Sequence, residues 1–250
     1  ESDNGDIWVG TRSNVITKYD KKTSRFENYH IDSFVETSAG VGAFEESRDG
    51  SIWFSTEDGL FNVEPVTKKH ENIHEFKVAS EKVNIKGIQA ISSDSNNNLW
   101  LGSSDGLVSF DVKGKIVKVF KHDEKNVNSL PHNRVNHLIP DGKDNLWVGT
   151  EHGLSYFNVK TGVFSNYSNN INDSSSLSHN YVLSLALDQV GNLWVGTKGG
   201  LNLMDMKTGK FTVFDEVDGL LDTVIHSVQV DNEGFVWVST NRGLSQLNPS

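Results

Sequence analysis

The stretch Asn192-Leu193-Trp194-Val195-Gly196-Thr197, followed by Gly200-Leu201, decides the fold, because near-copies of it recur along the chain. The copies centre on the six tryptophans of the sequence, which are spaced 45, 47, 47, 47 and 43 residues apart. These tryptophans are Trp8, Trp53, Trp100, Trp147, Trp194 and Trp237. An internal period of this length indicates a repeat architecture, in which each unit is too small to bury a core of its own.

Each repeat divides into four short segments of strand length. In the repeat around Trp194, the first segment is the apolar run from Tyr181 to Asp188, which is typical of a strand buried on both faces. A polar turn leads to the tryptophan segment, a third segment begins at Gly200, and a fourth ends at Phe214. Four strands joined by hairpins at this period describe a propeller blade, and no stretch shows the sustained apolar period of a helix.

The sequence therefore predicts an all-β protein, a β-propeller of four-stranded antiparallel blades over residues 1–250. The repeat around Trp8 lacks an inner strand, and the repeat around Trp237 lacks an outer strand. Five inner, six second, six third and five outer strands make 22 strands, or about five and a half blades. We expect an excerpt of a larger, seven-bladed propeller, whose unpaired strand edges favour association.

Composition and motifs exclude several functions. The net charge is -10 and the 23 basic residues are scattered thinly, which argues against nucleic acid as a partner. No apolar run reaches the ~18 residues that span a membrane, so we expect no direct membrane contact within this segment. The sequence has no cysteine, no metal-ligand pattern and no catalytic or phosphate-binding motif, so it predicts no catalytic residue, metal or cofactor.

Comparing the repeats with one another separates structural positions from candidate functional ones. Six residues after the tryptophan stands Gly in five repeats and Asn14 in the first, which predicts a backbone position with positive φ. Two residues after it only Gly or Ser occurs, which predicts close packing of another backbone or ring. The pairs His132-Asn133 and His179-Asn180 recur at the same place, so we expect them to cap a turn. The tryptophans themselves are expected in the core.

The candidate ligand contacts are large polar residues that differ from repeat to repeat. Most lie in the two-residue turn before the recurring Gly, or in the long loops between blades, and we expect both sets of loops at one mouth of the channel. One more stands on an inner strand where other repeats have Ala or Ser. The candidates are Arg12, Arg134, His137, His152, Tyr181, Lys198, His226 and Arg242. The alternative for each turn residue is a solvated hairpin tip.

The segment from Leu177 to Phe211 carries the strings L-x-x-N-x-V, G-N-L-W-V-G-T, G-L and K-T-G-x-F, and it resembles the two-component regulator propeller repeat. The resemblance covers essentially the whole chain and is strongest from Leu130 to Phe214. It implies the sensory region of a bacterial membrane sensor, which lies in the periplasm ahead of a transmembrane helix and a histidine kinase or diguanylate cyclase. Many such sensors respond to oligosaccharides. The family motif is structural and transfers no binding residues.

Three functional hypotheses follow. The leading one is a non-catalytic, periplasmic ligand-sensing domain of an inner-membrane protein, with a small molecule or oligosaccharide as ligand. Its partners would be the rest of a longer sensor chain and a second copy in a homodimer. A propeller enzyme similar to the streptogramin lyases is one alternative, and it would need a metal-dependent cluster of His and carboxylate at one mouth. A protein-interaction or dimerisation scaffold is the other, and a large exposed apolar patch would favour it.

Overall fold

The fold is described from a computed structural model of the chain. The structure describes every residue except 1, 3, 12–14, 31–39, 48, 57–58, 66, 68, 74, 79–80, 85–86, 97, 111–115 and 250. The chain divides into two compact units, Glu1–Val119 and Phe120–Ser250.

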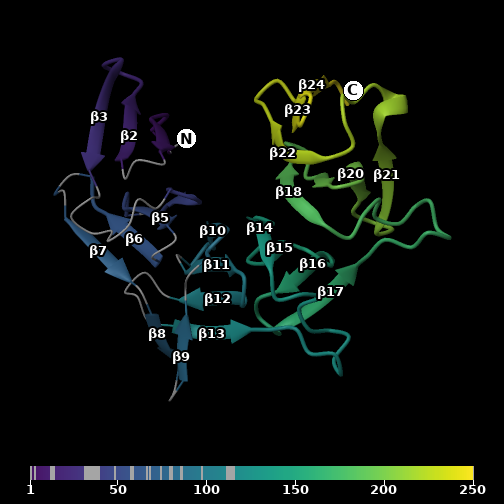
Figure 1. The fold of residues 1–250 in the computed structure, drawn as a ribbon, viewed down its shortest axis with the longest axis horizontal. Coiled ribbons are helices and arrows are strands. Elements are labelled where there is room, and N and C mark those ends of the chain that lie inside the picture. The colour runs from purple at the N-terminus through teal and green to yellow at the C-terminus, as the bar shows by residue number, and fades with distance from the viewer. Residues whose placement is uncertain are drawn as a thin grey trace. The chain divides into compact units, whose positions relative to one another are not determined.

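The second unit consists of antiparallel sheets whose strands neighbour one another in chain order (Figure 1). Two sheets have four strands each and the last has three. The first sheet contains β14 (Val135–Pro140), β15 (Leu146–Thr150), β16 (Gly153–Asn158) and β17 (Val163–Tyr167). The second contains β18 (Val182–Leu187), β19 (Leu193–Thr197), β20 (Gly200–Asp205) and β21 (Lys210–Phe214). The third contains β22 (Ile225–Val230), β23 (Val236–Thr240) and β24 (Gly243–Leu247).

The first unit repeats this organisation. A three-stranded sheet contains β1 (Ile7–Gly10), β2 (Val15–Asp20) and β3 (Arg25–His30). The next contains β4 (Phe44–Glu46), β5 (Ile52–Thr56), β6 (Gly59–Val63) and β7 (His70–Ile73). The last contains β10 (Ala90–Ser93), β11 (Leu99–Ser103), β12 (Gly106–Phe110) and β13 (Ile116–Phe120), which ends at the boundary of the unit.

The fold prediction is confirmed, because all the predicted strands form and pair in the predicted order. The first sheet lacks an inner strand and the last lacks an outer strand, as expected. Two elements were not predicted: the hairpin of β8 (Glu75–Val78) and β9 (Glu81–Asn84), and a 3-10 turn at Glu216–Asp218. Both lie between blades, and the described residues of the other repeats contain no counterpart, so comparison of the repeats gives no signal for them. Among the described residues, no helix is long and apolar enough to cross a membrane.

The tryptophans hold neighbouring blades together within each unit. Trp147 packs with residues of the next blade that include Leu193 and Val195, and Trp194 packs on the blade after that. The four tryptophans from Trp53 to Trp194 are at most 3% exposed, which confirms their prediction as core. Trp8 is only half-buried and Trp237 is 39% exposed.

The recurring Gly before the third strand is required for two reasons. Gly200 has φ +125°, which L side chains rarely adopt, and an added Cβ would lie 2.7 Å from the Phe214 carbonyl oxygen. The small residue two positions after the tryptophan also has a close neighbour, as predicted. An added Cβ on Gly149 would lie 2.6 Å from a Val182 methyl, so at this position the neighbour is an aliphatic side chain rather than a backbone or ring.

The two ends of each blade have different turns. At one end, the second strand turns into the third just before the recurring Gly, as at Glu151-His152. We call this the Gly-turn end. At the other, the Asp-turn end, the inner strand turns into the tryptophan strand, as at residues 141–145. There the Asp141 carboxylate accepts the amides of Lys143 and Asn145, which fixes the turn.

Candidate functional site

Two variable positions of the repeat meet at the Gly-turn end of the second unit. Glu151 and Lys198 directly follow β15 and β19, and Arg134 and Tyr181 directly precede β14 and β18. The Glu151 amide donates to the Arg134 carbonyl at 3.3 Å. In the next blade, the Lys198 amide donates to the Tyr181 carbonyl at 3.2 Å. The backbone of the repeat therefore places the two variable side chains of each blade next to each other.

The side chains at these positions connect two neighbouring blades. The Tyr181 hydroxyl donates to Glu151 Oε1 at 2.8 Å across the blade boundary. Arg134 Nε lies 3.4 Å from the same oxygen, and the Arg134 side chain is 49% exposed. Lys198 Nζ lies 3.6 Å from the centroid of the Tyr181 ring, within the range of a cation–π contact. We call Arg134, Glu151, Tyr181 and Lys198 the Glu151 cluster.

The Glu151 cluster offers a ligand both donors and an acceptor. It holds two permanent cations and one carboxylate, so its charge is positive on a chain whose net charge is -10. The pKa of Tyr181 is raised, chiefly by its hydrogen bond to Glu151 and then by burial, so the phenol keeps its proton at neutral pH. Guanidinium, ammonium, phenol and carboxylate groups around one aromatic ring suit a ligand rich in hydroxyl groups or bearing an anion.

The recurring His-Asn pairs shape the loops that carry this cluster. Nδ1 of His132 and Nδ1 of His179 each accept the backbone amide two residues later, at 3.1 Å and 2.9 Å. The side-chain oxygens of Asn133 and Asn180 each accept a backbone amide from the start of the same loop, at 2.7 Å. The prediction that these pairs cap a turn is therefore confirmed, and they position Arg134 and Tyr181.

His152 extends the cluster along the turn. Its ring centroid lies 4.7 Å from that of His132. The pKa of His132 is lowered, first by burial and then by the nearby His152, so the charged form of His132 is disfavoured. His152 itself is exposed and follows Glu151 directly, so it lies at the solvent side of the same site.

His137 lies inside the sheet rather than in the turns. It stands on β14 opposite Gly149, next to a bulge in the strand. Its Nδ1 is buried and has no hydrogen-bond partner among the residues that the structure describes. Burial lowers the pKa of His137 to about 4, so the imidazole is neutral at physiological pH.

The remaining candidates lie apart from the Glu151 cluster. In the last blade, His226 Nε2 lies 2.6 Å from Asn241 Oδ1, and Asn241 occupies the turn position of Glu151 and Lys198. Arg242 Nε lies 3.8 Å from an Asp222 oxygen. Within the described parts of the chain, no hydrogen bond or ion pair joins these residues to the Glu151 cluster. Arg12 falls outside the described residues.

Glu151 is the residue that sequence reasoning missed. Its turn was recognised as variable, but His152 was chosen as the candidate and the carboxylate beside it was not. The missing signal was geometric: Tyr181 and Arg134 both reach the same carboxylate oxygen, although they lie on different blades. Over the described residues, no group of three or more His, Cys, Asp or Glu side chains is arranged to hold a metal ion.

Comparison with known proteins agrees with this architecture. The model of the two component regulator propeller family matches residues 129–152, 176–199 and 219–242. Each match runs from the end of a long loop, through the inner strand and the tryptophan strand, to the two residues of the Gly-turn. No curated protein gives a significant match.

Three solved structures are similar in fold. One is the extracellular domain assigned to a hybrid two component system of B. thetaiotaomicron, with a TM-score of 0.55 and 19% identity over 98% of this chain and 40% of that one. Another is virginiamycin B lyase of Staphylococcus aureus, with a TM-score of 0.70 and 13% identity over 98% and 81%. The third is PorZ, a surface component of the type-IX secretion system of Porphyromonas gingivalis, with a TM-score of 0.77 and 16% identity over 99% and 37%.

Identities this low establish the fold alone. The chain spans about two fifths of the length of the two component system domains that it resembles. The family matches fall on repeats that the structure shows as successive blades of the second unit. The chain therefore carries two component regulator propeller repeats, and its fold is a β-propeller.

Proposed function

We propose that this chain is the ligand-sensing propeller region of a bacterial two-component sensor, that it acts outside the cytoplasm in the periplasm, and that it is non-catalytic. The family of its repeats and its structural likeness to an extracellular domain of a hybrid two component system support this proposal. In this proposal the chain works as part of a longer sensor protein, and a homodimer passes the binding signal on.

The observation that carries the proposal is the Glu151 cluster. Equivalent turn positions on one scaffold hold a carboxylate, an ammonium and an amide at Glu151, Lys198 and Asn241. Recognition is normally built from variable loops on a rigid frame, and here the variable side chains contact one another across a blade boundary. Glu151 can accept hydrogen bonds from a ligand, and Arg134 and Lys198 can donate them. The Tyr181 ring provides a flat apolar face. These groups match an oligosaccharide, which offers hydroxyls on its edges and C–H groups on its faces.

The test is calorimetric titration of the chain with a panel of neutral and acidic oligosaccharides, together with thermal shift. A bound ligand should raise the melting temperature as its concentration exceeds Kd. Glu151→Gln should weaken binding by about tenfold or more, because the substitution removes a charged acceptor inside the site. Lys207→Ala, on an exposed turn at the opposite end of its blade, is the control and should bind as the unmodified chain does. Unchanged affinity in Glu151→Gln would contradict the assignment of this site.

A lyase activity is the second candidate, because the chain covers 81% of virginiamycin B lyase with a TM-score of 0.70. Incubating the chain with a streptogramin B antibiotic and divalent cations, and following product by mass spectrometry, tests this alternative. Turnover that is lost on adding a chelator would favour the enzyme over the sensor.

A further inference from the structure

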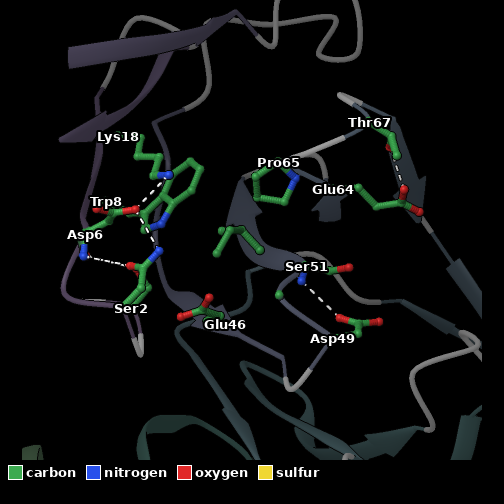
Figure 2. Close-up of a pocket in the computed structure, with 13 residues that line it drawn as sticks. Ser2, Asp6, Trp8, Lys18, Glu46, Asp49, Ser51, Glu64, Pro65 and Thr67 are labelled. Atoms are coloured by element: carbon green, nitrogen blue, oxygen red, sulfur yellow. Dashed lines mark hydrogen bonds and ion pairs between the residues drawn. The ribbon is translucent and has the colours of Figure 1, made fainter. Parts of the chain in front are cut away.

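A hollow lies in the first unit, at the Asp-turn end. A cavity of about 470 Å³ opens between the sheet of β1 to β3 and the sheet of β4 to β7. Figure 2 shows Trp8 and Lys18 on the left, Glu46 at the lower centre, and Pro65, Glu64 and Asp49 from the centre to the right. This cavity is independent of the Gly-turn site, because it involves the opposite end of the strands and different blades.

The packing beside this cavity differs from that of the other blades at the last residue of the inner strand. Glu46, the last residue of its inner strand, pairs with Ile52. The equivalent partners in the second unit are Pro140, Leu187 and Val230, and the last two pack against the hydrophobic core there. A carboxylate therefore stands where the blades of the second unit place an apolar side chain and the blade of β10 places Ser93.

The indole of Trp8, on the neighbouring sheet of β1 to β3, is correspondingly open. Trp8 is half-buried and lines the cavity, whereas the equivalent Trp53 and Trp194 are 3% and 0% exposed. An aromatic ring that faces a hollow on one side and the core on the other gives a ligand an apolar surface of fixed position.

The lining is strongly negative. Among its described residues, four side chains are carboxylates, and Lys18 is the one cation. Lys18 is already engaged, because its Nζ lies 2.7 Å from Asp6 Oδ2. Glu64 accepts a hydrogen bond from the Thr67 hydroxyl at 2.6 Å, and Asp49 accepts from the Ser47 hydroxyl at 2.7 Å.

The hydrogen bonds to Asp49 also keep it ionised. Burial alone would raise the pKa of its carboxyl, but hydrogen bonds from Ser47 and Ser51 outweigh burial and lower it. A site that combines several carboxylates with an indole face attracts positive charge through both, since the ring face is itself electron-rich.

We propose that this cavity binds a small organic cation, a protonated or quaternary amine, attracted by the carboxylates that line it and with its carbon atoms against Trp8 and Pro65. A neutral sugar fits less well, because sugar hydroxyls need donors as well as acceptors and the charged donor Lys18 is occupied by Asp6. A metal ion also fits less well, because the described carboxylates do not converge into a group able to hold one.

The experiment titrates the full chain with putrescine and choline, and with maltose, calcium chloride and sodium acetate as comparison ligands, by calorimetry. The amines should bind saturably in the millimolar range or tighter, and the comparison ligands should not compete with them. Glu46→Gln and Asp49→Asn should each weaken amine binding by about tenfold, because each removes one charge from the site. Glu233→Gln, an exposed glutamate on the Asp-turn of another blade, is the matched control and should leave it unchanged.

Circular dichroism is used to check that each variant is folded. If Glu46→Gln does not fold, Asp49→Asn, on an exposed turn, tests the proposal by itself. Three results would overturn the proposal: no amine binding, amine binding that both carboxylate variants leave intact, or equal competition by maltose or calcium. Oligosaccharide binding at the Glu151 cluster is measured separately, so either proposal can fail while the other stands.

Discussion

Replacing Gly200 by alanine tests whether the repeat is held by backbone geometry at its Gly-turn. Gly200 has φ +125°, and an added Cβ would lie 2.7 Å from the carbonyl oxygen of Phe214, which is backbone and cannot swing away. Gly234 is the matched control, because its φ is +87° and an added Cβ there meets nothing within 4 Å. Alanine at Gly200 therefore suffers conformational strain and a steric clash, whereas alanine at Gly234 suffers strain alone.

The expected magnitudes differ accordingly. Backbone strain of about 1–3 kcal/mol and steric overlap of about 1–3 kcal/mol give roughly 4 kcal/mol for Gly200→Ala. For a chain of this length, that loss corresponds to a fall in Tm of about 8–16 °C. Gly234→Ala should cost about 1 kcal/mol, or about 2–4 °C.

Both variants are compared with the unmodified chain by thermal unfolding, followed by circular dichroism and by tryptophan fluorescence at one scan rate. Agreement between the two probes shows whether the units unfold together. Gly234→Ala controls for the loss of glycine itself, since both variants reduce the freedom of the unfolded chain equally. If Gly200→Ala costs no more than Gly234→Ala, the contact with the Phe214 carbonyl does not constrain the repeat, and the reasoning is refuted.

Three further predictions concern buried groups. Trp194→Leu should destabilise the chain by about 3 kcal/mol, and Trp237→Leu, at a 39% exposed site, by less than half of this, as measured by chemical denaturation. Burial lowers the pKa of His137 to about 4, so its contribution to the free energy of unfolding is complete above about pH 6.5 and is lost as pH falls toward 4. His137→Ser should therefore reduce the loss of unfolding free energy over this pH range. Burial and then the hydrogen bond to Asp141 raise the pKa of Tyr156 to about 12, so its contribution is complete below about pH 10 and is lost as pH rises toward 12; Tyr156→Phe should remove this alkaline loss.

The fold could be predicted from the sequence because the repeats align the chain with itself. Each tryptophan fixes the register of one strand, and the Gly six residues later fixes the next turn, so the strand order follows. The hairpin β8–β9 could not be predicted in this way, since it lies between one pair of blades and no element corresponds to it in the parts of the other repeats that the structure describes.

The candidate site was predictable only in part. The variable turn and the loop before the inner strand identify Arg134, Tyr181 and Lys198, because both segments end at the Gly-turn. The convergence of Arg134 and Tyr181 on Glu151 depends on how far the Tyr181 side chain reaches from one blade to the next, and repeat spacing does not contain that distance. The cavity beside Trp8 could not be predicted, because comparison of the repeats treats the six tryptophans as equivalent. Glu46, the polar residue that lines the cavity with Trp8, lies in a different repeat.

In the second unit, the residues that stabilise a blade and the residues of the Glu151 cluster lie at different places along the strands, so binding and stability can be tested separately. The buried indoles and the Asp-turn hydrogen bonds stabilise the blade, and they lie away from the Gly-turn end. In the Arg134–Glu151 ion pair the side chains are 49% and 21% exposed and the atoms lie 3.4 Å apart, and partly exposed pairs of this kind contribute about 0–1 kcal/mol. Substitutions in the Glu151 cluster should therefore leave Tm nearly unchanged, and a loss of affinity in Glu151→Gln would report on recognition rather than on unfolding. The stability of the scaffold is what allows the residues at its Gly-turn end to differ from blade to blade.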